Sequence, residues 1–317
     1  MTLNGALSAE PNGPASALVI GNFDGVHRGH QALVAFTLDL AHQNGLEPQA
    51  MTFDPHPAQV LSGSPPPVLT TLERKIELLE SLALGLRVVV QHFDSEFSRL
   101  SPLDFVERIL VGRNHVRQLV VGANFRFGRN RAGNVQVLQE LGERFGFNAH
   151  AFELSADAHG SISSSRIRQL ITAGDVALAK ELLGRPHALT GLVVHGDGKG
   201  RTIGFPTANL EQIAELRPLP GVYAAHTEIL DGGLATAIGP SVVHIGPRPT
   251  VQRGETVEAH VIHQDRDLYG KTVRINLLGR VRGLVQLANL EALKPLIEQD
   301  VAAALQIYHA FVGSGVG

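Results

Sequence analysis

The chain has 317 residues, of which 44% are hydrophobic, and a formal net charge of −3. This length suits two globular domains, and the near-neutral charge argues against a strong non-specific nucleic-acid binder. The chain has no cysteine, which excludes disulfides and thiolate metal sites. No apolar run approaches the roughly 20 residues of a membrane span, so we expect no membrane partner and a cytoplasmic protein.

Residues 1–16 have neither a basic start nor an apolar stretch, so we interpret them as a disordered lead-in and not as a secretory signal. Beyond them, short apolar strands alternate with helices. The predicted strands cover 17–21, 49–53, 87–91, 118–122 and 148–154; the predicted helices include 31–44, one from near Thr70 with the stripe Leu72, Ile76, Leu79 and Ala83, and one from Ser101. This alternation predicts an open parallel sheet, a Rossmann-like α/β domain that binds ligands at the carboxyl ends of its strands.

The most informative segment, GNFDGVHRGH (21–30), lies where the first strand turns into a helix. His27 and His30 are three residues apart and share a helix face. The free N–H groups of a helix start and the small residues of the turn suit a polyphosphate, and two imidazoles can stabilise charge that develops on it. The segment predicts a nucleoside triphosphate site built for attack at the α-phosphate, with nucleotide contacts from the turn residues Gly21, Asn22, Phe23, Asp24 and Gly25.

Two other interpretations of the histidines stay open. They could be surface residues, or half of a zinc site whose further ligands lie elsewhere in the chain. Their place in a Gly-rich turn between a strand and a helix favours the phosphate interpretation.

Further segments of the first domain could complete this site. FDPHP (53–57) follows a strand, and GANFRFGRNRAGN (122–134) follows another. Phe125 and Phe127 could stack on a flat ring, or simply pack the loop. ISSSRIR (162–168) places hydroxyls and arginines at a helix start, which predicts a second anion site; a plain serine N-cap with surface arginines is the alternative.

The sequence changes character at GRPHALTG (184–191), after two short predicted helices at 164–173 and 176–183. Short alternating segments follow at 189–195, 222–229, 241–245, 256–263 and 272–278, and then an amphipathic helix at 290–311. They predict a small antiparallel barrel with one helix packed across its side. We therefore expect domains at 17–186 and 187–317.

The second domain carries its own phosphate signal in GDGKGRTIGFPTANL (196–210). Its glycines, including Gly198 and Gly200, let the backbone bend around an anion, although the spacing is not that of a Walker A loop. The oxygens of Thr207 and Asn209 suit Mg²⁺ with bound nucleotide phosphates. In TVEAHVIH (256–263), Glu258 lies on the polar side of an alternating strand, as a general base or as a solvated barrel-face carboxylate.

Together these motifs resemble one family, the bifunctional bacterial riboflavin kinase/FMN adenylyltransferases, or FAD synthetases. The resemblance runs from about residue 17 to 310 and rests on GNFDGVHRGH, FDPHP, GANFRFG, ISSSRIR, GRTIGFPTANL, PGVYA (220–224), RPT (248–250), VEAH and DLYG (267–270). The HxGH motif is common to many nucleotidyltransferases, whereas GFPTAN with VEAH downstream is much more specific to riboflavin kinases. The resemblance implies a nucleotidyltransferase domain followed by a riboflavin kinase-like barrel.

The resemblance implies two reactions with ATP, riboflavin, FMN and FAD as substrates or products and Mg²⁺ as cofactor. It makes His27, His30 and Glu258 the catalytic residues and Thr207 and Asn209 the metal contacts. The remaining expected contacts are the phosphate grip Ser163, Ser164, Ser165 and Arg168, and the flavin contacts Asn124, Phe125, Phe127, Asn209 and Arg282.

The chain departs from the family pattern at several positions. Ser165 stands where a threonine is usual, and His244, Pro247, Val251, Leu284 and Leu287 are unusual near the expected flavin pocket. One alternative is therefore an FMN adenylyltransferase with an impaired or altered kinase. An adenylyltransferase for another cofactor does not explain GFPTAN and VEAH, and a non-catalytic flavin-binding regulator does not explain the retained His27, His30 and Glu258.

Overall fold

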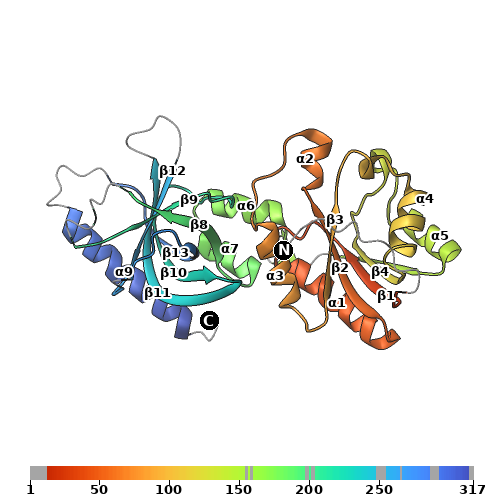
Figure 1. The fold of residues 1–317 in the computed structure, drawn as a ribbon, viewed down its shortest axis with the longest axis horizontal. Coiled ribbons are helices and arrows are strands. Elements are labelled where there is room, and N and C mark those ends of the chain that lie inside the picture. The colour runs from red at the N-terminus through yellow and green to blue at the C-terminus, as the bar shows by residue number, and fades with distance from the viewer. Residues whose placement is uncertain are drawn as a thin grey trace. The chain divides into compact units, whose positions relative to one another are not determined.

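The computed structural model describes residues 13–153, 156–157, 160–196, 200, 204–247, 255–264, 266–285 and 293–313. The chain divides into two compact units (Figure 1). The sheet unit comprises Met1–Pro66 and Leu72–Ser163, and the barrel unit comprises Pro67–Thr71 and Ser164–Gly317. Along the chain this division falls between Ser163 and Ser164, whereas the sequence analysis placed the boundary at residue 186, after the two short helices.

Within the described residues, the sheet unit contains a five-stranded parallel sheet in the order β3-β2-β1-β4-β5, which confirms the predicted α/β architecture. The strands are β1 (Ser16–Ile20), β2 (Glu47–Asp54), β3 (Arg87–His92), β4 (Val116–Gly122) and β5 (Asn148–Phe152). The helices are α1 (Arg28–Asn44), α2 (Pro57–Ser62), α3 (Leu72–Glu80), η1 (Phe97–Arg99), α4 (Pro102–Asp104), the π-helix η2 (Phe105–Val111), η3 (Arg129–Arg131) and α5 (Val135–Phe145); β6 (Ala156–Asp157) and β7 (Gly160–Ser161) pair with each other.

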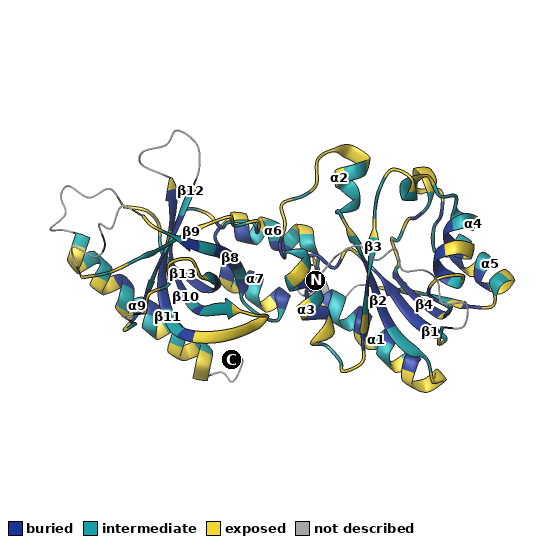
Figure 2. Ribbon diagram, viewed as in Figure 1, coloured by how far each residue is buried: buried dark blue, intermediate teal, exposed yellow. Residues whose placement is uncertain are grey.

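Successive side chains of the buried strands point to opposite faces of this sheet. Leu18 and Ile20 pack with residues of η2 and α5 in one core, whereas Val19 packs with residues of α1 and α3 in the other. Strands covered on both faces need apolar side chains at every position, which is why β1 shows no polar alternation. The dark strands between partly exposed helices in Figure 2 reflect this arrangement.

Two sequence expectations need correction in this unit. The lead-in was predicted to be disordered through residue 16, but Ser16 already belongs to β1, is fully buried and donates its hydroxyl to the carbonyl of Asn114; residues 1–12 lie outside the described part. Helix α3 begins at Leu72, and of its predicted apolar stripe only Leu79 is buried. Lys75 and Leu78 complete its buried face.

The strand order places two loops side by side: the loop after β1, which carries GNFDGVHRGH, and the loop after β4, which carries GANFRFGRNRAGN. β1 lies between β2 and β4. The chain runs from β1 through β2 to β3 at one edge of the sheet, and then crosses back over β1 to reach β4 on its other side. The loops that follow β1 and β4 therefore leave neighbouring strands at the point where the winding direction reverses, which is where ligands bind in such sheets.

The barrel unit contains a closed antiparallel barrel in the order β10-β11-β12-β9-β8-β13, counted over its described strands. The strands are β8 (His187–Val194), β9 (Ala208–Glu211), β10 (Gly221–Asp231), β11 (Leu234–Pro247), β12 (Glu255–Val261) and β13 (Thr272–Arg282), with helices α6 (Ser164–Thr172), α7 (Val176–Leu183) and α9 (Leu293–Gly313). The predicted barrel and terminal helix are confirmed. The sequence analysis missed β9, which contains the end of the GFPTAN motif.

Alternation along the barrel strands separates an inner from an outer face. Val257 and Ala259 of β12 point into the barrel core, and Glu258 between them lies on the outer face. On that outer face, α9 covers a second cluster that contains Val222, Val242 and Ala304. No helix among the described residues is both long enough and apolar enough to cross a membrane.

Glu215 gives the barrel unit a pH-dependent stability that can be measured. Burial raises the pKa of this carboxyl above its ordinary value of 4.5, although the N–H of Thr190 donates to it (3.3 Å) and Arg274 attracts it. A carboxyl with a raised pKa binds its proton more tightly in the folded state. It therefore contributes stability below its ordinary pKa, and this contribution is lost as the pH rises through the raised value.

We expect the unfolding free energy of the wild type, relative to Glu215→Gln, to rise as the pH falls through the raised pKa towards 4.5. Urea unfolding followed by tyrosine fluorescence measures it, because all three tyrosines lie in the barrel unit and the chain has no tryptophan. Glu298→Gln, at an exposed position of α9, is the control. A difference that does not vary with pH would contradict the assignment.

Candidate functional site

The turn between β1 and α1 has a strained backbone. Phe23 and Val26 adopt positive φ angles of 49° and 38°, and Gly25 lies between them at 85°. A β-branched valine in this region is unfavourable, and such conformations persist only where the surrounding structure fixes them. The Val26 N–H donates to the carbonyl of Phe23 (3.1 Å), which closes the turn. The chain is therefore bent sharply just before the two histidines.

His27 and His30 lie together at the start of α1, as predicted. His27 is the N-cap: its Nδ1 accepts the His30 N–H (3.3 Å), so a neutral His27 carries its proton on Nε2. The two rings stack with centroids 3.6 Å apart. A Cβ on Gly29 would come within 3.2 Å of the His27 ring, so glycine at this position leaves room for the stack. His27 is buried and His30 half-buried, which makes His30 the more accessible imidazole.

The expected nucleotide contacts of the turn divide into two groups. Gly21 and Asn22 line a cavity of about 720 Å³. The side chains of Phe23 and Asp24 are buried, 0% and 6% exposed, and Phe23 meets the His30 ring edge-on at 5.2 Å between centroids. Gly25 is also buried. Phe23, Asp24 and Gly25 therefore expose little or no surface to a ligand, and their nucleotide contacts stay a prediction.

The cavity also contains the residues expected to approach flavin. Asn124, Phe125 and Phe127 line it together with the arginines 126, 129 and 131 of the same loop. The rings of Phe125 and Phe127 are stacked, 14° from parallel. Phe127 is only 6% exposed and belongs to the core, so both interpretations of these rings hold in part: Phe127 packs the loop, and Phe125 is partly exposed beside the cavity.

Four further phenylalanines line this cavity, and the sequence analysis missed their role. They form a continuous chain of ring contacts with Phe125 and Phe127, and they are Phe53, Phe93, Phe97 and Phe105. The available signal was positional. Phe53 is the last residue but one of β2, and Phe93 directly follows β3, so both lie at carboxyl strand ends, where a parallel sheet binds its ligands.

The serine–arginine motif spans the point where the chain passes from one unit to the other. Ser163 ends the sheet unit, whereas Ser164, Ser165 and Arg168 belong to α6 of the barrel unit. Ser165 is exposed, and Arg168 Nε donates to the carbonyl of Pro67 (2.7 Å). The grouping of this motif with His27 and His30 stays a prediction.

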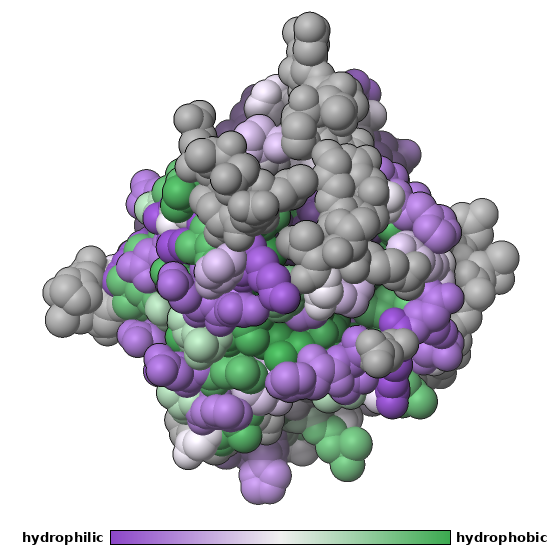
Figure 3. All heavy atoms as spheres, turned by 90° about the vertical axis from the view of Figure 1, so that its left-hand side faces the viewer, coloured by the Kyte–Doolittle hydropathy of each residue, from purple (hydrophilic) through white to green (hydrophobic). Residues whose placement is uncertain are grey.

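The expected kinase residues fall into one row on the outer face of the barrel. Asn209 of β9 pairs with Glu258 of β12, and Glu258 pairs with His244 of β11. His244 pairs with Val222 of β10, and Val222 pairs with Arg282 of β13. The row thus brings together the predicted base and two predicted flavin contacts, Asn209 and Arg282, which are more than 70 residues apart in sequence. Figure 3, which faces the barrel unit, shows hydrophobic atoms gathered between bands of hydrophilic ones.

His244 is an exposed residue, but its neighbours shield part of its ring from water. This desolvation lowers the pKa of His244, and the charge of Arg282 also lowers it, whereas Glu258 and Asp300 raise it. His244 also lies against Gly246, where a Cβ would come within 2.9 Å of its ring. The unusual residue therefore stands directly beside the predicted base. Pro247 and Leu284 are exposed, and Gly198, Val251 and Leu287 lie outside the described residues.

Thr207 and Asn209 lie against the glycine-rich segment. A Cβ on Gly196 would come within 2.1 Å of Asn209 Nδ2, and one on Gly200 within 2.3 Å of the Phe205 carbonyl. Glycine is required at both positions for this close approach. The neutral side-chain oxygens of Thr207 and Asn209 form a donor set that fits Mg²⁺ with nucleotide phosphates. Among the described residues, no group of three or more His, Asp or Glu side chains is arranged to hold a metal ion.

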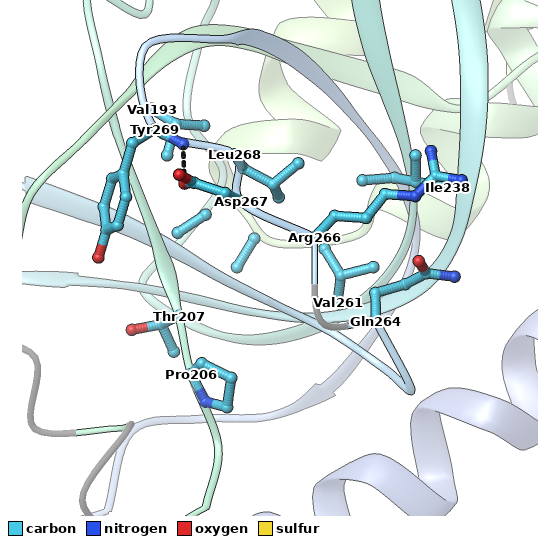
Figure 4. A pocket seen from close by; sticks show the side chains of 12 residues that line it. Val193, Pro206, Thr207, Ile238, Val261, Gln264, Arg266, Asp267, Leu268 and Tyr269 are labelled. Carbon is cyan, nitrogen blue, oxygen red and sulfur yellow. Dashed lines mark hydrogen bonds between the residues drawn. The ribbon is translucent and has the colours of Figure 1, made fainter.

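A cavity of about 520 Å³ opens beside Thr207 (Figure 4). Tyr269 lies on one side and Arg266 and Gln264 on the other, and the Tyr269 N–H donates to Asp267 (3.0 Å). The Tyr269 ring also stacks on His195, with centroids 3.8 Å apart. Apolar side chains from β8, β11 and β12 complete the lining. The cavity thus joins an aromatic wall to the threonine of the GFPTAN motif.

Arg282 forms an ion pair with Asp300 of α9, which was not foreseen. Its Nε and Nη2 donate to the two carboxylate oxygens, each at 2.7 Å, and Asp300 is 4% exposed. This bidentate pair joins β13 to the helix that covers the outer face. The guanidinium that was expected to contact flavin is therefore held in place by the fold itself.

Replacing Asp300 by alanine is expected to destabilise the barrel unit by about 3 kcal/mol, because it leaves the Arg282 guanidinium without its buried partner. Urea unfolding followed by tyrosine fluorescence measures the loss. Asp231→Ala, at an exposed strand end, is the control and should leave the urea concentration at the unfolding midpoint unchanged. Equal midpoints for the two variants would show that the pair contributes nothing.

Comparison with known proteins agrees with this division into two sites. Residues 9–166 match a family model described as FAD synthetase, and residues 183–308 match one described as riboflavin kinase. The bifunctional riboflavin kinase/FMN adenylyltransferase of Escherichia coli (strain K12) is 37% identical over 92% of both chains. That of Haemophilus influenzae is 34% identical over 93% of this chain and 94% of its own.

One solved structure is similar over nearly the whole chain. It is described as a macrolide-efflux protein from Streptococcus pneumoniae, with a TM-score of 0.81, 27% identity and coverage of 93% of this chain and 95% of its own. The likeness supports the fold of the described elements.

Proposed function

The chain belongs to the family of bifunctional riboflavin kinase/FMN adenylyltransferases, and from that premise we propose which of its residues carry each reaction. The enzyme phosphorylates riboflavin to FMN and then transfers AMP from a second ATP to FMN, which gives FAD and pyrophosphate. The kinase model matches residues 183–308, so nothing in the comparisons favours the alternative of an impaired kinase. We assign residues 17–186 and 187–317 to the two reactions, a division that places α6 and α7 with the first domain although they are packed in the barrel unit.

Adenylyl transfer takes place at the turn after β1. An oxygen of the FMN phosphate attacks the α-phosphorus of ATP, a new P–O bond forms, and the bond from the α-phosphorus to the oxygen that bridges to the β-phosphate breaks. His30, supported by the stacked His27, and the N–H groups at the start of α1 stabilise the charge that develops on these phosphates. The FMN phosphate is already ionised, so this step needs positioning more than base catalysis.

The flavin of FMN occupies the cavity of about 720 Å³ that the phenylalanines line. Its flat ring system lies against Phe125, and Asn124 supplies a polar contact. Gly21 and Asn22 line the same cavity, so the FMN phosphate can approach the histidine turn while the ring stays among the aromatic side chains. We assign Ser163, Ser164, Ser165 and Arg168 to the second phosphate grip, as the resemblance implies.

Phosphorylation of riboflavin takes place on the barrel unit. Glu258 accepts the proton of the 5′-hydroxyl as its oxygen bonds to the γ-phosphorus of ATP, and ADP leaves as the bond between the γ-phosphorus and the bridging oxygen breaks. ATP lies in the cavity beside Thr207 and Tyr269, and riboflavin lies on the outer face near Asn209. Mg²⁺, which Thr207 and Asn209 would hold, supplies charge neutralisation for the phosphates when bound.

The observation that carries this assignment is the cross-strand row that puts Glu258 beside Asn209, two residues from Thr207. Purified protein with riboflavin, ATP and Mg²⁺ should form first FMN and then FAD, resolved by chromatography. A protein that adenylylates supplied FMN but leaves riboflavin unchanged would contradict the kinase assignment. A protein that stops at FMN would contradict the adenylyltransferase assignment.

A further inference from the structure

Lys75 is a buried lysine that neither reaction uses. It lies on α3 and is 8% exposed, and it is the only lysine among residues 1–179. Burying an ammonium is costly unless other groups compensate for the lost hydration. The ammonium of Lys75 on the buried face of α3 therefore needs polar or acidic partners in the sheet unit. These partners identify its role.

The first partner is a hydroxyl that reaches the histidine turn. Lys75 Nζ donates to Thr52 Oγ1 (3.3 Å), and Thr52 Oγ1 donates to the carbonyl of Asn22 (3.1 Å). A threonine hydroxyl has one proton, so accepting from the ammonium directs that proton to Asn22. The two bonds act in series, and each polarises the other in this buried setting. The ammonium thus fixes the backbone of Asn22, which lines the FMN cavity.

The second partner is the acidic residue inside the turn. Burial lowers the pKa of Lys75, and the fields of Asp24 and Asp54 oppose this shift; Asp24 is itself only 6% exposed. Asp24 lies between the two strained residues Phe23 and Val26. A strained turn persists only where its surroundings determine it, and the ammonium attracts the carboxylate that lies between the strained residues.

We propose that Lys75 is a positioning residue for adenylyl transfer: it holds Asn22 through Thr52 and attracts Asp24, and so positions the turn that carries His27 and His30. The proposal rests on the proposed function of that turn. Lys75 lies on α3 and is not among the residues that line the FMN cavity, so it acts through the turn and not on the substrates.

A positioning role differs in its kinetics from a purely structural one. If the turn is misplaced, the bound substrates lose their reactive alignment, so kcat falls while KM for FMN and ATP changes little. A misplacement of about 1 Å costs about 10²-fold in rate. If Lys75 only stabilised the fold, the surviving folded enzyme would turn over at the normal rate.

The experiment compares Lys75→Met, Thr52→Val and the double variant in FAD formation from FMN and ATP. Arg87→Met, which removes the same charge at a half-exposed position of β3, is the matched control. Phosphorylation of riboflavin by the same samples reports on the barrel unit, and circular dichroism reports on folding. We expect kcat to fall about 10²-fold in Lys75→Met and to fall in Thr52→Val, with KM little changed. The double variant should lose less than the product of the single losses, because both residues act through one chain of bonds.

Three outcomes would overturn the proposal. They are a wild-type kcat in folded Lys75→Met, a loss confined to KM, and single losses that multiply in the double variant. Should Lys75→Met fail to fold, an unchanged kcat in Thr52→Val would overturn it. A wild-type enzyme that makes no FAD would instead refute the proposed function, so the two failures are distinguishable.

Discussion

Replacing His30 by alanine is expected to lower the rate of FAD formation from FMN and ATP by about 10²–10³-fold, the usual cost of removing a group that stabilises charge in the transition state. FMN formation from riboflavin should continue at the wild-type rate. His30 is the better choice of the two histidines because His27 caps α1, so its loss would also weaken the helix. Single-turnover assays with FMN, read by chromatography, measure the effect.

His42→Ala is the control for this variant, since His42 is an exposed residue of the same helix. It should keep both activities. If folded His30→Ala lost both reactions in equal measure, the two sites would not be independent. If it lost neither, the histidine turn would not be the adenylyl transfer site.

Replacing Glu258 by glutamine is expected to have the opposite effect. Glutamine keeps the shape of the side chain but cannot accept the proton of riboflavin, so FMN formation should fall by about 10²–10⁴-fold, the contribution of a general base. FAD formation from supplied FMN should be unchanged. Steady-state assays of each half-reaction in the same sample measure both.

Glu255→Gln, at an exposed position of the same strand, is the matched control. Mixing the two variants gives a sharper test. His30→Ala should supply the FMN that Glu258→Gln converts, so the mixture should make FAD from riboflavin although neither variant does so efficiently alone. A mixture that stays inactive would show that the reactions cannot be separated.

The local pattern of the chain was enough to predict most elements. The strand segments are apolar and short, and the Gly-rich turn with its two histidines lies where a strand must end and a helix begin. The alternation around Glu258 correctly placed this residue outside the barrel core. In each case the signal comes from residues within a few positions of one another, where chain geometry alone sets the spacing.

The buried face of α3 shows where such patterns fail. A prediction from apolar periodicity assigns lysine to the surface. It therefore placed Leu72 and Ile76 in the core and did not include Lys75. The cost of burial is offset by Thr52 and Asp24, which are remote in sequence. The sequence could not show that the three meet.

The amino-acid sequence by itself determined the two-part architecture, the histidine turn and the polar side of the Glu258 strand, because each depends on local backbone geometry and on the period of apolar residues. Only the tertiary structure decided that phenylalanines from four segments line one cavity and that Asn209, Glu258, His244 and Arg282 share one cross-strand row. Those groupings depend on strand order and register. Contacts between distant segments set both, and no spacing within the chain encodes them.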